Sequence, residues 1–274
     1  MSLLGPDDRF ALICGNNREH YADVGKVDAV ITDPPYGAEV HSPVRAARNA
    51  EGYLSVFDMP FEQLDSLDIG QLASFASIHC NGWMLTFCQA EQLVQWRDEA
   101  TVFGVRYVVP MVWIKPDAKP NFSGAGPGVG HENIATFWCG DGPQHWNGGG
   151  KVGVFHHTRG RREGTRHPTE KPVPLMKELI RLFTDPGDIV FDPFMGAGST
   201  GVAALELGRR FIGIEKNPEY FTEADRRIRE AVVPNLIFAS NDKMPTLMGD
   251  TEFPGRHHNE RFRKAAKEKS DADE

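Results

Sequence analysis

The chain has 274 residues, of which 40% are hydrophobic, and it carries a formal net charge of −8. A chain of this length can bury one large α/β core. It shows no leader peptide and no apolar run near twenty residues, so we expect a soluble, cytoplasmic protein that does not enter a membrane. Its four cysteines have no C-x-x-C spacing, which predicts buried free thiols and not a disulfide framework.

The negative net charge argues at first against nucleic-acid binding, because phosphate contacts require Lys and Arg side chains. The local distribution of charge is different from the average. Five basic residues cluster within thirteen positions: Arg159, Arg161, Arg162, Arg166 and Lys171.

Short apolar runs bounded by turn residues predict strands, and apolar residues at helical spacing predict helices. In chain order, the expected strands cover residues 10–14, 27–32, 83–88, 106–114, 134–139, 188–192 and 211–214. The expected helices cover residues 18–26, which could also form a loop, and residues 61–80, 91–103, 173–183, 202–207 and 218–232. Asn81-Gly82 is expected to end the second helix before the strand that follows.

The alternation of strands and helices predicts an α/β fold with a doubly wound, mostly parallel sheet. The strands at 106–114 and 134–139 have no crossover helix between them, so one antiparallel strand is expected near the edge of the sheet. We expect a single domain over residues 1–234. Beyond it, residues 235–274 form a polar tail that is expected to be partly disordered.

Three segments between these elements are predicted to be loops. Residues 37–57 are polar and are interpreted as a mobile loop over a site or as an ordinary surface loop. Residues 115–132 and 140–166 are rich in Gly and Pro, which is typical of adaptable binding loops. The histidines of the last segment lack the spacing of a zinc site, so no metal is expected.

The strand at 27–32 is β-branched and is followed by Asp33-Pro34-Pro35-Tyr36. In an open α/β sheet, ligands bind where the parallel strands end. The two prolines fix the backbone, so the Asp33 carboxylate and the Pro34 carbonyl can both accept hydrogen bonds, with an aromatic ring alongside. This predicts a rigid site for an NH2 group on a ring. The alternative is an ordinary turn that ends a strand.

A second motif, Gly196-x-Gly198-x-x-Gly201, follows the strand at 188–192 and precedes a helix. Glu215 lies 19 residues past the first glycine, where an acid binds ribose hydroxyls. NAD and S-adenosylmethionine both fit this pattern, and a turn without a ligand is a third alternative. The motif comes late in the chain, whereas a nicotinamide enzyme normally opens with it. The position therefore favours S-adenosylmethionine.

Three ordered motifs together resemble the beta group of the amino-group DNA methyltransferases. They are the Asp33-Pro34-Pro35-Tyr36 element, the segment His167-Pro-Thr-Glu-Lys-Pro172, and the pattern Phe194-x-Gly196-x-Gly198. The resemblance covers about residues 9–225 and implies a circularly permuted methyltransferase fold. The first strand departs from the family pattern, because Gly15-Asn16 stands where many relatives have Gly-Asp.

The resemblance implies a site-specific enzyme that flips a base out of double-stranded DNA and methylates N6 of adenine with S-adenosylmethionine. Catalytic roles are implied for Asp33, Pro34, Pro35 and Tyr36. Cofactor contacts are implied for Asn16, Asp33, His167, Thr169, Lys171, Asp192, Phe194, Gly196, Gly198, Ser199, Thr200 and Glu215. The residues expected to contact DNA are Arg45, Arg48, Arg159, Arg161, Arg162 and Arg166.

Several alternatives stay open at this point. N4 of cytosine offers the same two donors as N6 of adenine, and adenine is favoured because relatives with Asp at the first motif position are mostly adenine-specific. More distant alternatives are an NAD-dependent oxidoreductase and an inactive DNA-binding module. The loops at 115–166, expected to read DNA, do not predict a recognition sequence. A homodimer and a partner restriction enzyme are also left open.

Overall fold

The computed structural model describes residues 3–35, 47–48, 54–55, 66–122, 124–159 and 170–239; of residues 47–48, 54–55 and 233–239 it describes the backbone alone. Its strands are β1 (Phe10–Cys14), β2 (Val27–Thr32), β3 (Ala47–Arg48), β4 (Leu54–Ser55), β5 (Cys80–Cys88), β6 (Arg106–Ile114), β7 (His131–Trp138), β8 (Val154–His156), β9 (Ile189–Asp192) and β10 (Arg210–Glu215). Its α-helices are α1 (Asn17–Val24), α2 (Ser66–His79), α3 (Leu93–Val102), α4 (Val173–Phe183), α5 (Ser199–Glu206) and α6 (Pro218–Ala239).

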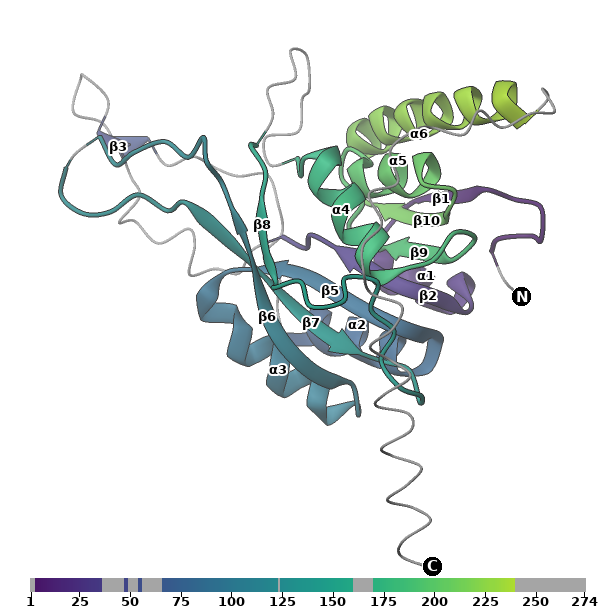
Figure 1. Ribbon diagram of the computed structural model, residues 1–274, viewed down its shortest axis with the longest axis horizontal. Coiled ribbons are helices and arrows are strands. Elements are labelled where there is room, and N and C mark those ends of the chain that lie inside the picture. The colour runs from purple at the N-terminus through teal and green to yellow at the C-terminus, as the bar shows by residue number, and fades with distance from the viewer. Residues whose placement is uncertain are drawn as a thin grey trace, which may run out of the picture.

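Eight of the strands form one sheet in the order β1-β10-β9-β2-β5-β7-β6-β8 (Figure 1). Strand β7 pairs antiparallel with both of its neighbours, and every other pair in this sheet is parallel. The predicted mostly parallel sheet with one antiparallel strand is therefore confirmed. The remaining strands, β3 and β4, pair with each other as a short antiparallel ribbon.

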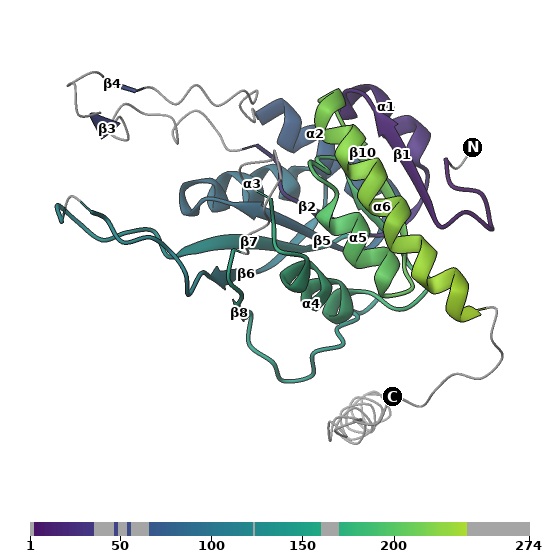
Figure 2. The same cartoon turned by 90° about the horizontal axis from the view of Figure 1, so that it is seen from above.

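Helices cover both faces of the sheet (Figure 2). One core cluster joins the sheet to α4, α5 and α6, and it includes Leu179, Val202 and Ile228. A second cluster joins the other face to α1, α2 and α3, and it includes Leu72 and Trp96. Strands buried on both faces explain the continuous apolar runs in the sequence. The doubly wound prediction is confirmed.

Several boundaries differ from the sequence prediction, and α5 begins at Ser199, three residues earlier than expected. Strand β5 begins at Cys80, so Asn81-Gly82 lies inside a strand and does not separate it from α2. Strand β7 begins at His131, three residues earlier than expected. The loop predicted over residues 140–166 contains the short strand β8, which pairs parallel with β6.

The C-terminal helix also extends further than predicted, because α6 continues through Pro234 to Ala239. It therefore passes the expected domain end at residue 234. Within the described residues, no helix is long and apolar enough to cross a membrane.

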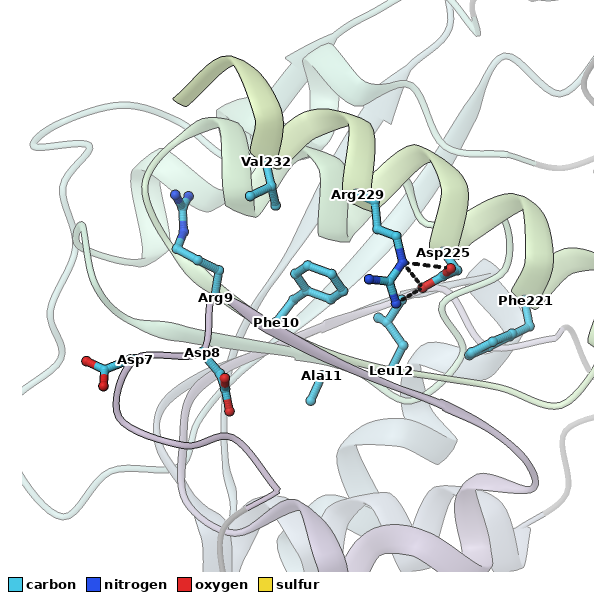
Figure 3. Close-up of a pocket in the computed structure, with 10 residues that line it drawn as sticks. All are labelled: Asp7, Asp8, Arg9, Phe10, Ala11, Leu12, Phe221, Asp225, Arg229 and Val232. Atoms are coloured by element: carbon cyan, nitrogen blue, oxygen red, sulfur yellow. Dashed lines mark hydrogen bonds and ion pairs between the residues drawn. The ribbon is translucent and has the colours of Figure 1, made fainter. Parts of the chain in front are cut away.

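A hollow of about 530 Å³ lies along β1 and α6, at the outer edge of the sheet (Figure 3). Phe10 and Leu12 line it from the strand, and Phe221 and Arg229 line it from the helix. Arg229 donates to Asp225 on the same helix at 2.9 Å. From β1 the hollow is lined by residues 7–12, at the start of the strand, so it is distinct from the carboxyl ends of the strands, where the sequence motifs meet.

Gly82 allows a close approach between β5 and β2. A Cβ built there would lie 2.4 Å from the Asp28 carbonyl oxygen, at a shift in the β2–β5 register. We therefore expect Gly82→Ala to lower the free energy of unfolding by about 1–3 kcal/mol in denaturant titrations. The control Gly126→Ala, where a Cβ meets nothing within 4 Å, should change it by less than about 0.5 kcal/mol. Equal effects of the two changes would contradict this account.

Candidate active site

The carboxyl ends of four neighbouring parallel strands bring the sequence motifs to one edge of the sheet. Asp33 follows β2, Asp192 ends β9, Glu215 ends β10, and Asn16 follows β1. The register pairs Cys14 with Glu215, so β1 and β10 end level with one another, and it pairs Asp192 with Gly213, two residues before the end of β10. This is the edge at which open α/β sheets bind ligands.

Asp33 is held by an ion pair with a lysine from a distant part of the chain. The Lys171 ammonium donates to Oδ2 of Asp33, whereas Oδ1 is shielded from solvent and has no hydrogen-bond partner among the described residues. Burial raises the pKa of Asp33 to about 6, although the neighbouring Lys171 charge opposes this shift. Asp33 therefore has one buried acceptor that no described residue satisfies, and a ligand donor that reaches it would satisfy it.

Lys171 is itself buried between two carboxylates. Its Nζ contacts Asp33 and lies 3.2 Å from Oε2 of Glu132, and it sits 5.0 Å from the ring centroid of Phe87. The resemblance implied a cofactor contact for Lys171. The structure places its ammonium on Asp33 and Glu132, and a contact with a cofactor stays a prediction.

Glu132 is a site residue that the sequence analysis missed. It also binds the ammonium of Lys115, which follows β6. Burial alone would raise the pKa of Glu132. The charges of Lys171 and Lys115 oppose this effect and hold that pKa below its usual range. Glu132 reaches this edge because β7 runs antiparallel, so that the start of β7 lies beside the ends of β5 and β6. The only signal in the sequence is an acid two residues before the apolar run of a strand.

Asp192 braces the glycine-rich turn from inside the protein. Its Oδ1 accepts hydrogen bonds from the Thr32 hydroxyl at 2.7 Å and the Phe194 amide at 3.1 Å, and its Oδ2 accepts from the Thr200 hydroxyl at 2.6 Å. Both oxygens are thus engaged within the chain. These contacts tie β2, β9 and α5 together, and direct cofactor contacts of Asp192 and Thr200 stay predictions.

The glycine-rich turn is also tied to the end of β10. Gly196 and Gly198 adopt φ values of 53° and 80°, which favour glycine. The Gly196 amide donates to Oε2 of Glu215 at 2.8 Å, and the Asn217 amide donates to Oε1 at 2.7 Å. Burial raises the pKa of Glu215. The expected acid does lie beside the glycines, where it could also meet a ribose.

Ser199, at the start of α5, is engaged with a neighbouring acid. Its hydroxyl donates to Oε1 of Glu170 at 2.9 Å, and Arg227 of α6 donates to the same oxygen at 2.6 Å. Arg227 also donates to the Ala197 carbonyl. This buried network fixes the turn against α6. A cofactor contact by Ser199 stays a prediction.

Several other predicted residues are placed only in part. Asn16 caps α1, where its Oδ1 accepts from the Arg18 amide at 3.2 Å. The Arg159 guanidinium lies 3.4 Å from Asp117, and for Arg48 the structure describes the backbone alone. The residues outside the described part of the chain are Tyr36, Arg45, Arg161, Arg162, Arg166, His167 and Thr169.

A family model described as DNA methylase matches residues 27–226, which span the site from Asp33 to Glu215. Two proteins of Escherichia coli (strain K12) are similar over shorter segments. "Putative methylase YubD" is 55% identical over 76 residues, or 28% of this chain and 34% of that protein. The DNA adenine methyltransferase YhdJ is 50% identical over 66 residues, or 24% of this chain and 22% of that protein.

Solved structures extend the similarity over most of the chain. The complex of M1.HpyAVI with SAM has a TM-score of 0.63 at 27% identity, and the match covers 80% of this chain and 98% of that one. The cytosine-N4-specific PvuII DNA methyltransferase has a TM-score of 0.61 at 16% identity, with 84% and 93% covered. The second match concerns the fold alone.

The protonation of Asp192 should make the free energy of unfolding depend on pH. Burial raises its pKa from 3.8 to about 6, so the folded state binds a proton more tightly than the unfolded state. Its contribution to stability is therefore present at about pH 4 and is lost as the pH rises through 6. The substitution Asp192→Asn should remove this loss of stability with rising pH. The unfolding free energy of the variant, measured relative to the unmodified chain, should rise by up to about 3 kcal/mol between pH 4 and 7. A difference that does not change with pH would contradict the assignment.

Proposed function

The chain belongs to the N6/N4 DNA methylase family, and from this premise we propose that it transfers a methyl group from S-adenosylmethionine to an exocyclic base amine in double-stranded DNA. The observation that carries the proposal is Oδ1 of Asp33 at the end of β2, a buried acceptor to which no described residue donates a hydrogen bond. A buried acceptor without a partner costs free energy unless a ligand donor fills it. An amine with two N–H bonds is such a donor.

The residues around the glycine-rich turn fit the proposed cofactor. The turn has no side chain at Gly196, which allows a ligand to approach the backbone, and Glu215 ends the adjacent strand. At Gly198 a Cβ would come within 3.0 Å of the Ala224 Cβ, so the turn tolerates only glycine there. When bound, S-adenosylmethionine supplies an electrophilic methyl group on a sulfonium.

Asp33 and its neighbours provide the acceptor chemistry. Oδ1 of Asp33 and the Pro34 carbonyl would accept the two N–H bonds of the amine, and Oδ1 would hold the proton that the nitrogen releases. The base must leave the stack first, which costs a few kcal/mol, and Tyr36 would stack on it. Alignment of two reactants in this way contributes about 7–11 kcal/mol over free encounter.

We assign adenine N6 as the target, in preference to cytosine N4. Asp at the first position of the motif supports this assignment, as does the similarity of one segment to the DNA adenine methyltransferase YhdJ. On the same proposal, basic side chains beside the site would contact DNA phosphates, Arg159 among them.

The first test is Asp33→Ala in an assay of radiolabelled methyl transfer to mixed-sequence DNA. The loss of the acceptor should lower turnover by at least about 100-fold, since one transition-state hydrogen bond of this kind contributes 10²–10³. Cofactor affinity, measured by calorimetry, should stay within a few-fold because Asp33 acts on the amine.

The matched control is Asp23→Ala at an exposed position of α1, which should leave turnover unchanged. The proposal fails if the unmodified chain transfers no label to DNA. Heat protection by NAD would then favour an oxidoreductase, and DNA binding without turnover would indicate an inactive module.

A second test identifies the methylated base. DNA modified by the purified chain is digested to nucleosides, and the products are identified by mass. N6-methyladenine is the expected product. N4-methylcytosine as the sole product would contradict the assignment of the target atom but not the proposal of methyl transfer.

A further inference from the structure

Four charged side chains form one cluster at the site, and two of them belong to no motif of the sequence analysis. This charge cluster consists of Asp33, Lys171, Glu132 and Lys115. Lys171 bridges the two carboxylates, and Glu132 bridges the two ammonium groups. The side chains are 5% to 22% exposed. With two charges of each sign, the cluster is neutral.

Without Glu132 the charge cluster would no longer be neutral. Lys171 would then lose one of its two carboxylate partners in the cluster, and the cluster would carry one net positive charge. A buried charge of this kind is weakly screened, so it acts on its neighbours more strongly than a surface charge does. It would make the Asp33 carboxylate a weaker hydrogen-bond acceptor. The oxygen concerned is Oδ1, which no described residue bonds.

We propose that Glu132 is a positioning residue for methyl transfer: it binds Lys171 jointly with Asp33 and, with Lys115, keeps the charge cluster neutral so that Asp33 remains a strong acceptor. This inference rests on the proposed function. Methyl transfer to an amine leaves positive charge on the nitrogen, which on the proposed function would lie beside Asp33 until the proton is released. A neutral cluster does not oppose this charge, whereas a cluster with one net positive charge does.

The geometry around Glu132 supports a role beyond folding. Lys115 lies 4.8 Å from the ring centroid of Trp113, and Lys171 packs over Phe87, so apolar groups surround both ammonium ions. Among the described residues, the ionisable groups that face Asp33 are Lys171, Glu132, Lys115, Cys88 at the end of β5 and Asp192 at the end of β9. Of the four that carry a charge when ionised at neutral pH, Glu132 and Lys115 can be exchanged without touching a predicted motif.

The test compares pH profiles of turnover for three variants. Glu132→Gln leaves the cluster with one net positive charge, so the acid limb set by Asp33 should move to lower pH by about one unit, and turnover should fall about tenfold. Lys115→Met leaves one net negative charge, so the limb should move to higher pH. The double variant Lys115→Met/Glu132→Gln is neutral again, and its limb should return toward that of the unmodified chain.

The matched control is Glu178→Gln, because Glu178 also bridges two basic groups, Lys151 and His157, but on α4 and away from Asp33. It should leave the acid limb in place. A purely structural role of Glu132 predicts a lower melting temperature in Glu132→Gln without opposite shifts in the two single variants. An unmoved limb in both single variants, or no return in the double variant, would overturn the proposal. If Glu132→Gln does not fold, the acid limb of Lys115→Met alone tests the proposal. A move to higher pH supports it, and an unmoved limb overturns it.

A second readout separates this inference from the proposed function. Carboxyl 13C NMR titration, with Asp33→Asn to assign the signal, follows the Asp33 pKa without any turnover. If the unmodified chain methylates no DNA, the proposed function fails. In that case, opposite shifts of the Asp33 pKa in Glu132→Gln and Lys115→Met would still support the proposed effect of the charge cluster on Asp33. The absence of such shifts would overturn it.

Discussion

The site depends on the buried ion pair between Lys171 and Asp33, two residues that lie 138 positions apart. The pair joins the end of β2 to the segment that precedes α4, and the other oxygen of Asp33 has no hydrogen-bond partner among the described residues. A buried pair of this kind contributes little net stability, because desolvation offsets much of the attraction. On the proposed function, the pair holds an ionised acceptor in one orientation, where the amine of the target base would meet it.

The topology of the sheet brings the other groups to this pair. Parallel strands β9 and β10 place Asp192 and Glu215 at the same edge, where they brace the glycine-rich turn. The reversed direction of β7 brings Glu132 to that edge as well. The other charged groups of the site come from the carboxyl ends of strands or from the segments that follow them. Because β7 is antiparallel, Glu132 joins them from the start of a strand.

Much of this arrangement could be predicted from the sequence, because it depends on local patterns. Apolar runs located β2 and β6 with correct bounds, and Asp33 and Glu215 were recognised by their places after strands. The position of Glu132 could not be predicted, because its burial depends on pairing between β7, β5 and β6. Gly82 was likewise misread as a helix stop, since only the nearby Asp28 carbonyl shows why a strand needs glycine there.

The most direct measurement is a crystal structure of the chain with S-adenosylhomocysteine and DNA that contains its target base. The account predicts that the amine nitrogen of the flipped base lies about 2.7–3.2 Å from Oδ1 of Asp33, while Lys171 stays on Oδ2 and Glu132. A structure in which Lys171 leaves Asp33 for the cofactor carboxylate, with the amine bonded elsewhere, would contradict it.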